Sequence, residues 1–162
     1  MTDKIIVMRG SACIDAEVLG AVAREFGWAV ETAGDLREIA AAQASRATGR
    51  PAEPAAVLFH RSAFGSCSWL EAVRQLSLAL PRVHPIACHG FAEPIDWPGL
   101  CEAGAFHSLW LPLKESEVHQ SFGFVWEARK RRAKPAQRVQ RIAPARATAR
   151  GNHAQVLVST AS

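Results

Sequence analysis

Short apolar runs alternate with segments of helical periodicity, and this alternation restricts the fold more than any other feature of the sequence. Each apolar run has the length and the bounding residues of a buried strand, and each periodic segment has the repeat of an amphipathic helix. Strands are expected at 4–8, 28–32, 55–59, 85–88 and 106–111. Strands that alternate with helices over about 130 residues predict an α/β domain with a parallel, doubly wound sheet. The functional crevice of such a sheet lies at the carboxyl ends of its strands.

The expected helices begin and end at recognisable residues. Ser11 is placed to cap a helix that starts at Ala12, with Gly27 just past its end, and Asp35 is placed to cap the next helix. Pro81 stops the third helix. The expected helices lie at 12–26, 36–46 and 68–80, near 100–101, and at 114–132.

The charge of the chain divides at Glu127, the last acidic residue. Residues 1–127 hold 15 acids and 10 bases, a net charge of −5, whereas residues 128–162 hold nine bases and no acid, a net charge of +9; the sum is the +4 of the whole chain. Proline, alanine, glutamine and arginine dominate the end of the chain, a composition typical of unfolded segments. We therefore expect one domain over 1–132 and a disordered basic tail over 133–162.

A cluster of bases just before this tail is the candidate contact for polyanions: Arg129, Lys130, Arg131 and Arg132. Clustered arginine and lysine neutralise phosphates by counterion release without reading a base sequence. Aromatic residues, which stack on bases in proteins that bind single strands, are absent after Trp126. A nucleic-acid contact is therefore expected through the basic tail alone, and a solvated or tethering tail is the alternative.

The sequence carries no sign of export or of membrane insertion. No apolar run approaches the roughly 18 residues that cross a bilayer, and residues 1–8 do not form the hydrophobic region of a secretory signal. We expect a cytoplasmic protein without a membrane contact. In a reducing compartment, cysteines outside Cys-x-x-Cys pairs are expected to act as small apolar core residues. They are Cys13, Cys67, Cys88 and Cys101.

Two stretches of the chain resemble the receiver domains of bacterial response regulators. Residues 102–113 resemble the family's AGAxxYLxKP stretch around the fifth strand, and the loop that ends at Gly65 resembles its D-x-x-M-P-G loop. The resemblance covers residues 4 to about 130 and rests on spacing more than on identity. It implies a flavodoxin-like, doubly wound sheet of five parallel strands in the order 2-1-3-4-5 with flanking helices.

The residues that carry phosphoryl transfer in the receiver family are replaced here. His60 stands at the place of the phosphate-accepting aspartate, and Leu111 stands at the place of the lysine. Neither residue near the places of the metal-binding acids offers the carboxylate that Mg²⁺ prefers. All the degenerate pocket positions are Arg9, Gly10, His60, Cys88, His89 and Leu111, with Cys88 or His89 at the place of the switch hydroxyl. We expect a pseudo-receiver without a metal, a cofactor or enzymatic activity.

His60, Cys88 and His89 also permit an alternative interpretation as a metal or nucleophilic site. Imidazole and thiolate groups at neighbouring strand ends can bind zinc, but a third ligand is not evident. A histidine and cysteine pair can act as base and nucleophile, but no acid stands at a matched position to orient the imidazole. We expect His60 to form hydrogen bonds with backbone or water. The sequence also lacks the glycine-rich loops that bind dinucleotides and nucleotides.

The preferred function is a stand-alone pseudo-receiver that acts through a protein partner, or as a homodimer, in phosphorelay-type signal transduction or transcriptional regulation. Three aromatic residues form its candidate interface: Trp110, Phe124 and Trp126. Two of them fall off the apolar stripe of the last helix, which is made by Val118, Phe122 and Val125. The alternatives are that this wide stripe only packs on the sheet, or that the domain is a scaffold whose basic tail binds nucleic acid or an acidic partner.

Overall fold

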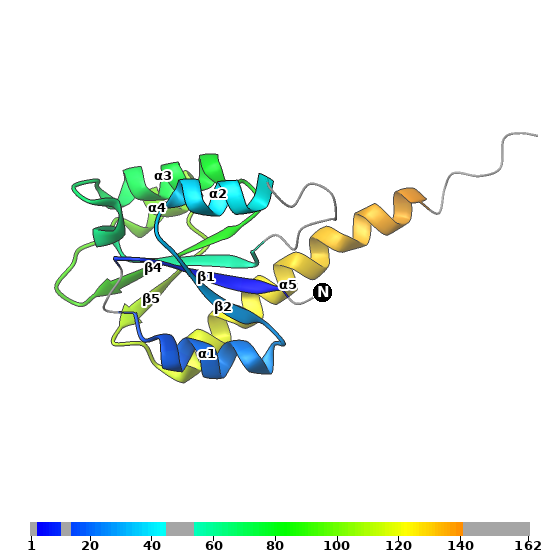
Figure 1. Ribbon diagram of the computed structural model, residues 1–162, viewed down its shortest axis with the longest axis horizontal. Coiled ribbons are helices and arrows are strands. Elements are labelled where there is room, and N and C mark those ends of the chain that lie inside the picture. Colours follow the sequence, from blue (N-terminus) through cyan, green and yellow to red (C-terminus); the bar gives the residue numbers. More distant parts are fainter. Residues whose placement is uncertain (1–2, 11–13, 45–53, 141–162) are drawn as a thin grey trace, which may run out of the picture.

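The computed structural model describes residues 3–10, 14–44 and 54–140. The strands form one parallel sheet in the order β2-β1-β3-β4-β5, with helices on both faces (Figure 1). The strands are β1 (Lys4–Met8), β2 (Ala29–Ala33), β3 (Ala56–Phe59), β4 (His84–Gly90) and β5 (His107–Leu111). The helices are α1 (Ala16–Glu25), α2 (Leu36–Ala44), α3 (Trp69–Ala79), α4 (Trp97–Ala103) and α5 (Glu115–Gln140), with a short 3₁₀ helix η1 (Arg61–Phe64). The predicted fold class and strand order are confirmed.

Alternate residues of each central strand fill two separate cores. On β3, Leu58 packs in the core under α1 and α5, whereas Val57 and Phe59 pack in the core under α2, α3 and α4. This division follows from the strand geometry, since successive side chains point to opposite faces of a sheet. Both faces of β1 and β3 are buried, which explains why β3 is apolar at every position and β1 is apolar after Lys4.

Helix α1 starts later than the sequence analysis predicted. Its N-cap is Asp15, whose Oδ1 accepts hydrogen bonds from the amides of Glu17 (2.9 Å) and Val18 (3.2 Å). The predicted start at Ala12 is therefore wrong, and Ser11 lies outside the described residues. Ile14 precedes the helix and is buried in the core beneath α1 and α5. Because Ile14 must reach this core, the chain turns into the helix only after it.

The start of α2 agrees with its predicted cap, and α3 has a cap that the sequence analysis did not predict. Asp35 Oδ1 accepts from the amide of Glu38 at 2.8 Å, as expected for a residue that caps α2. Ser68 and Glu71 form a reciprocal capping box at the start of α3. Each cap places an acidic or hydroxyl group at the carboxyl end of the sheet, because the helices run antiparallel to the strands.

Strands β2 and β4 and the last helix have other bounds than predicted. Strand β4 continues to Gly90, so His89 lies within the strand. Strand β2 begins at Ala29, because the Trp28 amide donates a hydrogen bond to the carbonyl oxygen of Ala23 at the end of α1 (2.9 Å). Helix α5 continues through 133–140, so the expectation of disorder is wrong for these residues. The rest of the predicted tail lies outside the described residues. No helix in the described part of the chain is long and apolar enough to cross a membrane.

The cysteines do not share one environment. Cys88 is buried in the core as predicted, whereas Cys67 is partly exposed. Cys101 is exposed on α4, so the expected core role is wrong for this residue. Cys101 occupies a solvent-facing position of a short helix, where its size has no packing consequence. Cys13 lies outside the described residues.

Candidate functional site

The imidazole of His60 is held at both nitrogens at the carboxyl edge of the sheet. Nε2 lies 2.9 Å from Oε2 and 3.1 Å from Oε1 of Glu93. Nδ1 lies 2.7 Å from Oγ of Ser62 and accepts a hydrogen bond from the Ser62 amide at 3.2 Å. The imidazole is therefore held by Ser62 at Nδ1 and by the Glu93 carboxylate, which accepts the Nε2–H.

The His60 network joins the loops that follow three strands. Ser62 Oγ donates a hydrogen bond to the carbonyl oxygen of Gly10, after β1, at 2.8 Å. Glu93 Oε2 accepts a hydrogen bond from the amide of Gly90, at the end of β4, at 3.1 Å. His60 itself follows β3. The prediction of backbone hydrogen bonds for His60 is confirmed by its bond with the Ser62 amide.

Glu93 is the functional residue that the sequence analysis missed. The expectation that no acid orients the His60 imidazole is wrong, because Glu93 reaches it from the loop after β4. Burial raises the pKa of the Glu93 carboxyl, but the hydrogen bonds from His60 and the Gly90 amide and the attraction of His60 and Arg61 outweigh it, so this pKa lies below its usual value. The predicted strand order could have pointed to Glu93, because the loops after the neighbouring parallel strands β3 and β4 meet at one edge of the sheet.

Cys88 and His89 point away from each other. Cys88 packs in the core under α1 and α5, whereas the His89 ring lies on the other face, between Trp69 (centroids 6.3 Å apart) and Trp110 (4.4 Å). Burial lowers the pKa of His89. The suggested joint site of His60, Cys88 and His89 therefore does not form. Among the described residues, no group of three or more histidine, cysteine or acidic side chains is placed to hold a metal ion.

The other predicted pocket positions also diverge. The Arg9 guanidinium lies beside Gly34, at the start of α2, where a Cβ on that glycine would be 3.7 Å from Nη1. Leu111, at the place of the family's lysine, packs against the core under α1 and α5. Gly10 contributes only its carbonyl oxygen to the His60 network. Of the six predicted positions, only Gly10 and His60 are joined by this network, through Ser62.

The candidate interface residues are exposed but lie on different surfaces. Trp110 sits on the sheet face opposite its neighbour Leu109, which is buried under α5. Phe124 packs edge-on against His107 of the edge strand β5, with the ring centroids 5.7 Å apart. Trp126 lies two residues further along α5, about 200° around the helix, beneath the Lys130 ammonium, which is 3.7 Å from its ring centroid. The three residues therefore do not form one patch.

An aromatic stack extends from His89 to solvent. The Trp110 ring covers His89, and Phe91 stacks on Trp110 with the centroids 4.4 Å apart and the planes at 17°. Phe91 is 78% exposed, whereas Trp110 is 41% exposed. The sequence analysis did not single out Phe91, since a lone aromatic in a loop has no periodicity from which its neighbours could be inferred.

Two of the four basic residues predicted to contact a polyanion instead contact other parts of this domain. Arg129 Nη2 pairs with Asp3 Oδ1 at 2.8 Å, before β1, and Arg132 Nη1 donates to the carbonyl oxygen of Arg82 at 3.1 Å. Lys130 lies 3.4 Å from Glu127 and over Trp126. The contacts of Arg129 and Arg132 fix α5 against the amino end of the sheet, whereas those of Lys130 lie within the helix. Arg131 is exposed to solvent.

No protein-family model matches the sequence, and no curated protein matches it. Solved structures match the fold. NtrX from Brucella abortus in complex with ADP superposes with a TM-score of 0.62 at 18% identity, over 90% of this chain and 31% of that one. A response regulator receiver domain protein from Clostridium thermocellum matches with a TM-score of 0.56 at 16% identity, over 79% of this chain and 97% of that one. This chain has the receiver fold.

A chemotaxis response regulator, CheY4 of Vibrio cholerae, gives the same result: a TM-score of 0.53 at 16% identity, over 77% of this chain and 99% of that one. The chain spans about a third of the length of the NtrX protein that it matches, and nearly the whole of the two shorter regulators. Identities this low establish the receiver fold alone. The chemistry must be argued from the residues at the carboxyl edge.

Proposed function

We propose that this protein is a signal-transduction module of the receiver type that acts through contacts with a protein partner, without aspartyl phosphorylation and without catalysing a reaction. The observation that carries the proposal is the His60 network. At the place of the phosphate-accepting aspartate stands an imidazole whose nitrogens are taken by Glu93 and Ser62. We place it in phosphorelay-type signalling or transcriptional regulation in the cytoplasm.

The electrostatics of the His60 site disfavour a phosphoryl group. A phosphoryl oxygen at His60 would meet the Glu93 carboxylate, and like charges at such distances repel. The resemblance places the metal ligands at Arg9 and Gly10, which supply no carboxylate. Leu111, at the place of the lysine, is uncharged, and its side chain packs against the core under α1 and α5. The metal site and the lysine, which compensate charge in phosphoryl transfer, are therefore both replaced at these positions.

The His60 network also makes phosphorylation unnecessary for connecting the loops of the site. In receivers, the phosphoryl group and the switch hydroxyl connect the loops after the third and fourth strands. Here, the Glu93 carboxylate accepts hydrogen bonds from His60 and from the Gly90 amide, and these bonds connect the same loops directly. We infer that the surface presented to a partner is set by this permanent connection.

Incubation with an acyl phosphate and Mg²⁺ is expected to leave the intact mass of the protein and its tryptophan fluorescence unchanged. Fluorescence reports on the site because Trp69 lies 5.6 Å from the His60 ring, centroid to centroid. A phosphorylatable receiver treated in parallel is the positive control. An acid-labile gain in mass that disappears in His60→Ala would show that His60 accepts phosphoryl groups and would overturn the proposal.

A second candidate function is nucleic-acid binding by the end of α5. It is favoured by the continuation of the helix to Gln140 in a sequence without acids after Glu127. A chain that ends after Ala133 retains Arg129 and Arg132, which contact the domain. We expect a salt-sensitive gel shift with duplex DNA for the full chain and a much weaker one for the shortened chain. The absence of a shift in both chains would reject this function.

A further inference from the structure

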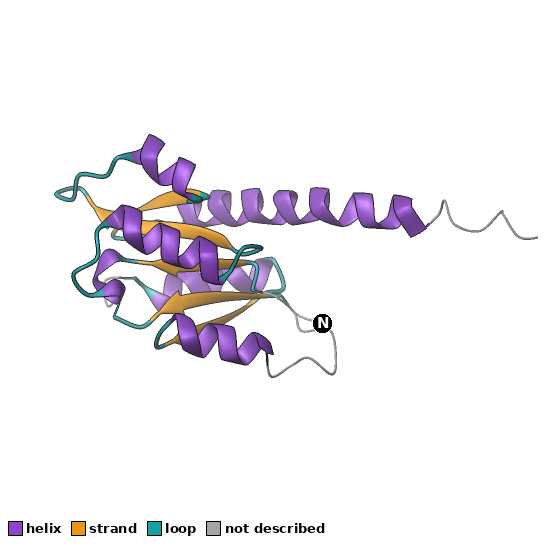
Figure 2. Cartoon of the chain, turned by 90° about the horizontal axis from the view of Figure 1, so that it is seen from above, coloured by secondary structure: helices purple, strands orange, loops and turns teal. Residues whose placement is uncertain are grey.

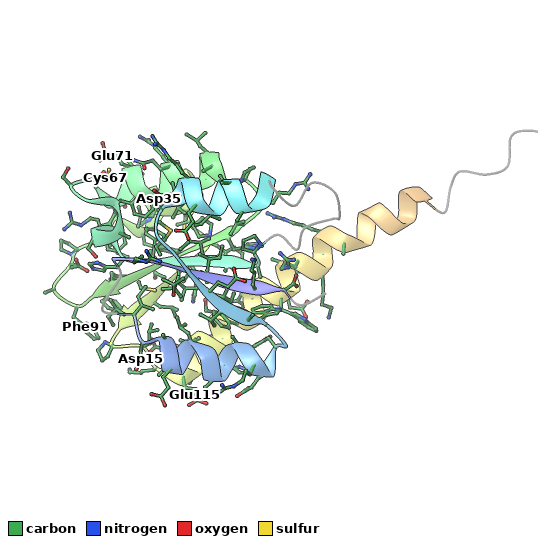
Figure 3. The ribbon with its side chains drawn as sticks, in the orientation of Figure 1. Asp15, Asp35, Cys67, Glu71, Phe91 and Glu115 are labelled. Atoms are coloured by element: carbon green, nitrogen blue, oxygen red, sulfur yellow. The ribbon has the colours of Figure 1, made fainter. Side chains whose placement is uncertain are left out.

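Charge is separated between the two ends of the molecule. All the α-helices begin at the carboxyl end of the sheet, where caps and first turns favour acidic residues. Figure 3 shows Asp15, Asp35, Glu71 and Glu115 around this end. The acids there are Asp15, Glu17, Asp35, Glu38, Glu71, Glu93, Asp96, Glu115 and Glu117, and the bases are Arg9, Arg37, Arg61 and Lys114. In the described part of the chain, this end therefore carries a net negative charge.

The acidic end also carries the most exposed aromatic ring of the described chain. Phe91 is 78% exposed and projects from this end of the molecule (Figure 3). One face of its ring stacks on Trp110. Glu93 and Asp96 follow it in the same loop, and Asp96 is exposed. An exposed aromatic ring at a negatively charged end of the molecule is complementary to a guanidinium or ammonium group.

The opposite end of the molecule offers such groups. Helix α5 runs beyond the sheet, away from the carboxyl ends of the strands (Figure 2). Its sequence after Glu127 contains bases and no acid, and Lys130 and Arg131 are exposed. Lys130 already lies over Trp126 within this chain. A basic side chain of α5 could form the same cation–π contact with an exposed aromatic ring of a second copy.

We propose that the basic end of α5 in one copy binds the Phe91 loop of a second copy, so that the protein associates head to tail. This inference deepens the proposed function by naming one partner, a second copy of the chain, and it does not depend on the state of His60. The contact joins two different surfaces. Repetition of such a contact gives open chains of copies rather than a closed dimer.

Charge selects this arrangement over a symmetric one. Two acidic ends repel each other, and two basic helix ends also repel, so only unlike ends attract. The association is therefore expected to weaken as salt rises from about 0.05 M to about 0.5 M, because the Debye length falls from above 10 Å to below 5 Å. A contact of one ring and a few ion pairs is small, so the expected association is weak and is seen at high protein concentration.

Sedimentation velocity on the full chain, after nuclease treatment, tests the proposal. We expect the weight-average sedimentation coefficient to rise with concentration at low salt and much less at high salt. Phe91→Ala is expected to weaken association about fivefold, and Arg131→Glu more strongly. Leu78→Ala, at another exposed apolar position, is the matched control and is expected to associate like the wild type.

A mixture of the two variants distinguishes the head-to-tail contact from a symmetric one. Phe91→Ala keeps an intact basic helix, and Arg131→Glu keeps an intact Phe91 loop. Their mixture is expected to form a 1:1 complex that does not grow further, because the remaining two ends are defective. The proposal is overturned by a monomer at all concentrations, by a mixture that stays monomeric while the wild type associates, or by association that requires nucleic acid. Acceptance of phosphoryl groups would overturn the proposed function and leave this contact standing.

Discussion

Phe122→Ala is expected to lower the free energy of unfolding by about 3–5 kcal/mol, the usual cost of truncating a buried phenylalanine. The Phe122 side chain is fully buried, and its ring packs against Trp28 (centroids 5.5 Å apart) and Phe26 (6.1 Å). These contacts fix α5 to α1 and to the sheet. Alanine would leave a cavity that a tightly packed core closes only in part. Urea unfolding followed by far-ultraviolet circular dichroism measures the change.

Phe124→Ala is the matched control for this change. It removes the same atoms from the same helix, but Phe124 is 48% exposed and packs edge-on against His107. The expected loss is below about 1 kcal/mol, as for surface positions. Equal losses for the two variants would contradict the assignment of inner and outer faces of α5. A small loss for Phe124→Ala would also make this variant suitable for binding tests.

The fold was predictable because periodicity reports burial directly. Val118, Phe122 and Val125 recur at helical spacing and are fully buried, and the central strands β1, β3 and β4 were found as short apolar runs. The start of α1 was not predictable from capping preference, since Ser11 and Asp15 are both good caps. Which of the two residues caps α1 depended on the packing of Ile14 in the core, and this tertiary packing has no signal in the local sequence.

The candidate site was predictable in position but not in its contacts. Parallel strands bring their carboxyl ends to one edge, so the importance of residues near His60 followed from the topology. The separation of Cys88 from His89 also followed from the period of two in a strand, once β4 was known to include both residues. Glu93 and Phe91 lie in a loop whose conformation has no sequence period. Their contacts with His60 and Trp110 required the structure.

Glu93→Ala is expected to lower the free energy of unfolding by about 2 kcal/mol at neutral pH. The change removes the acceptor for the His60 Nε2–H and for the Gly90 amide, and partly buried donors without acceptors cost about 1–3 kcal/mol. Glu102→Ala, at an exposed position of α4, is the matched control and is expected to change the free energy of unfolding little. His60→Ala should lower the free energy of unfolding by a similar amount. The double variant should lose less than the sum of the two single losses, because both single changes break the same network.

The cost of Glu93→Ala should also depend on pH in a defined direction. The pKa of the Glu93 carboxyl lies below the usual value of 4.5 in the folded protein. Its ionised form therefore stabilises the fold above pH 4.5, and this contribution is lost as the pH falls through the lower, folded-state pKa. The difference in unfolding free energy between the wild type and Glu93→Gln should shrink over that range. A difference that is constant with pH would mean that the carboxylate charge does not hold His60, and that the loops after β3 and β4 are joined by packing instead.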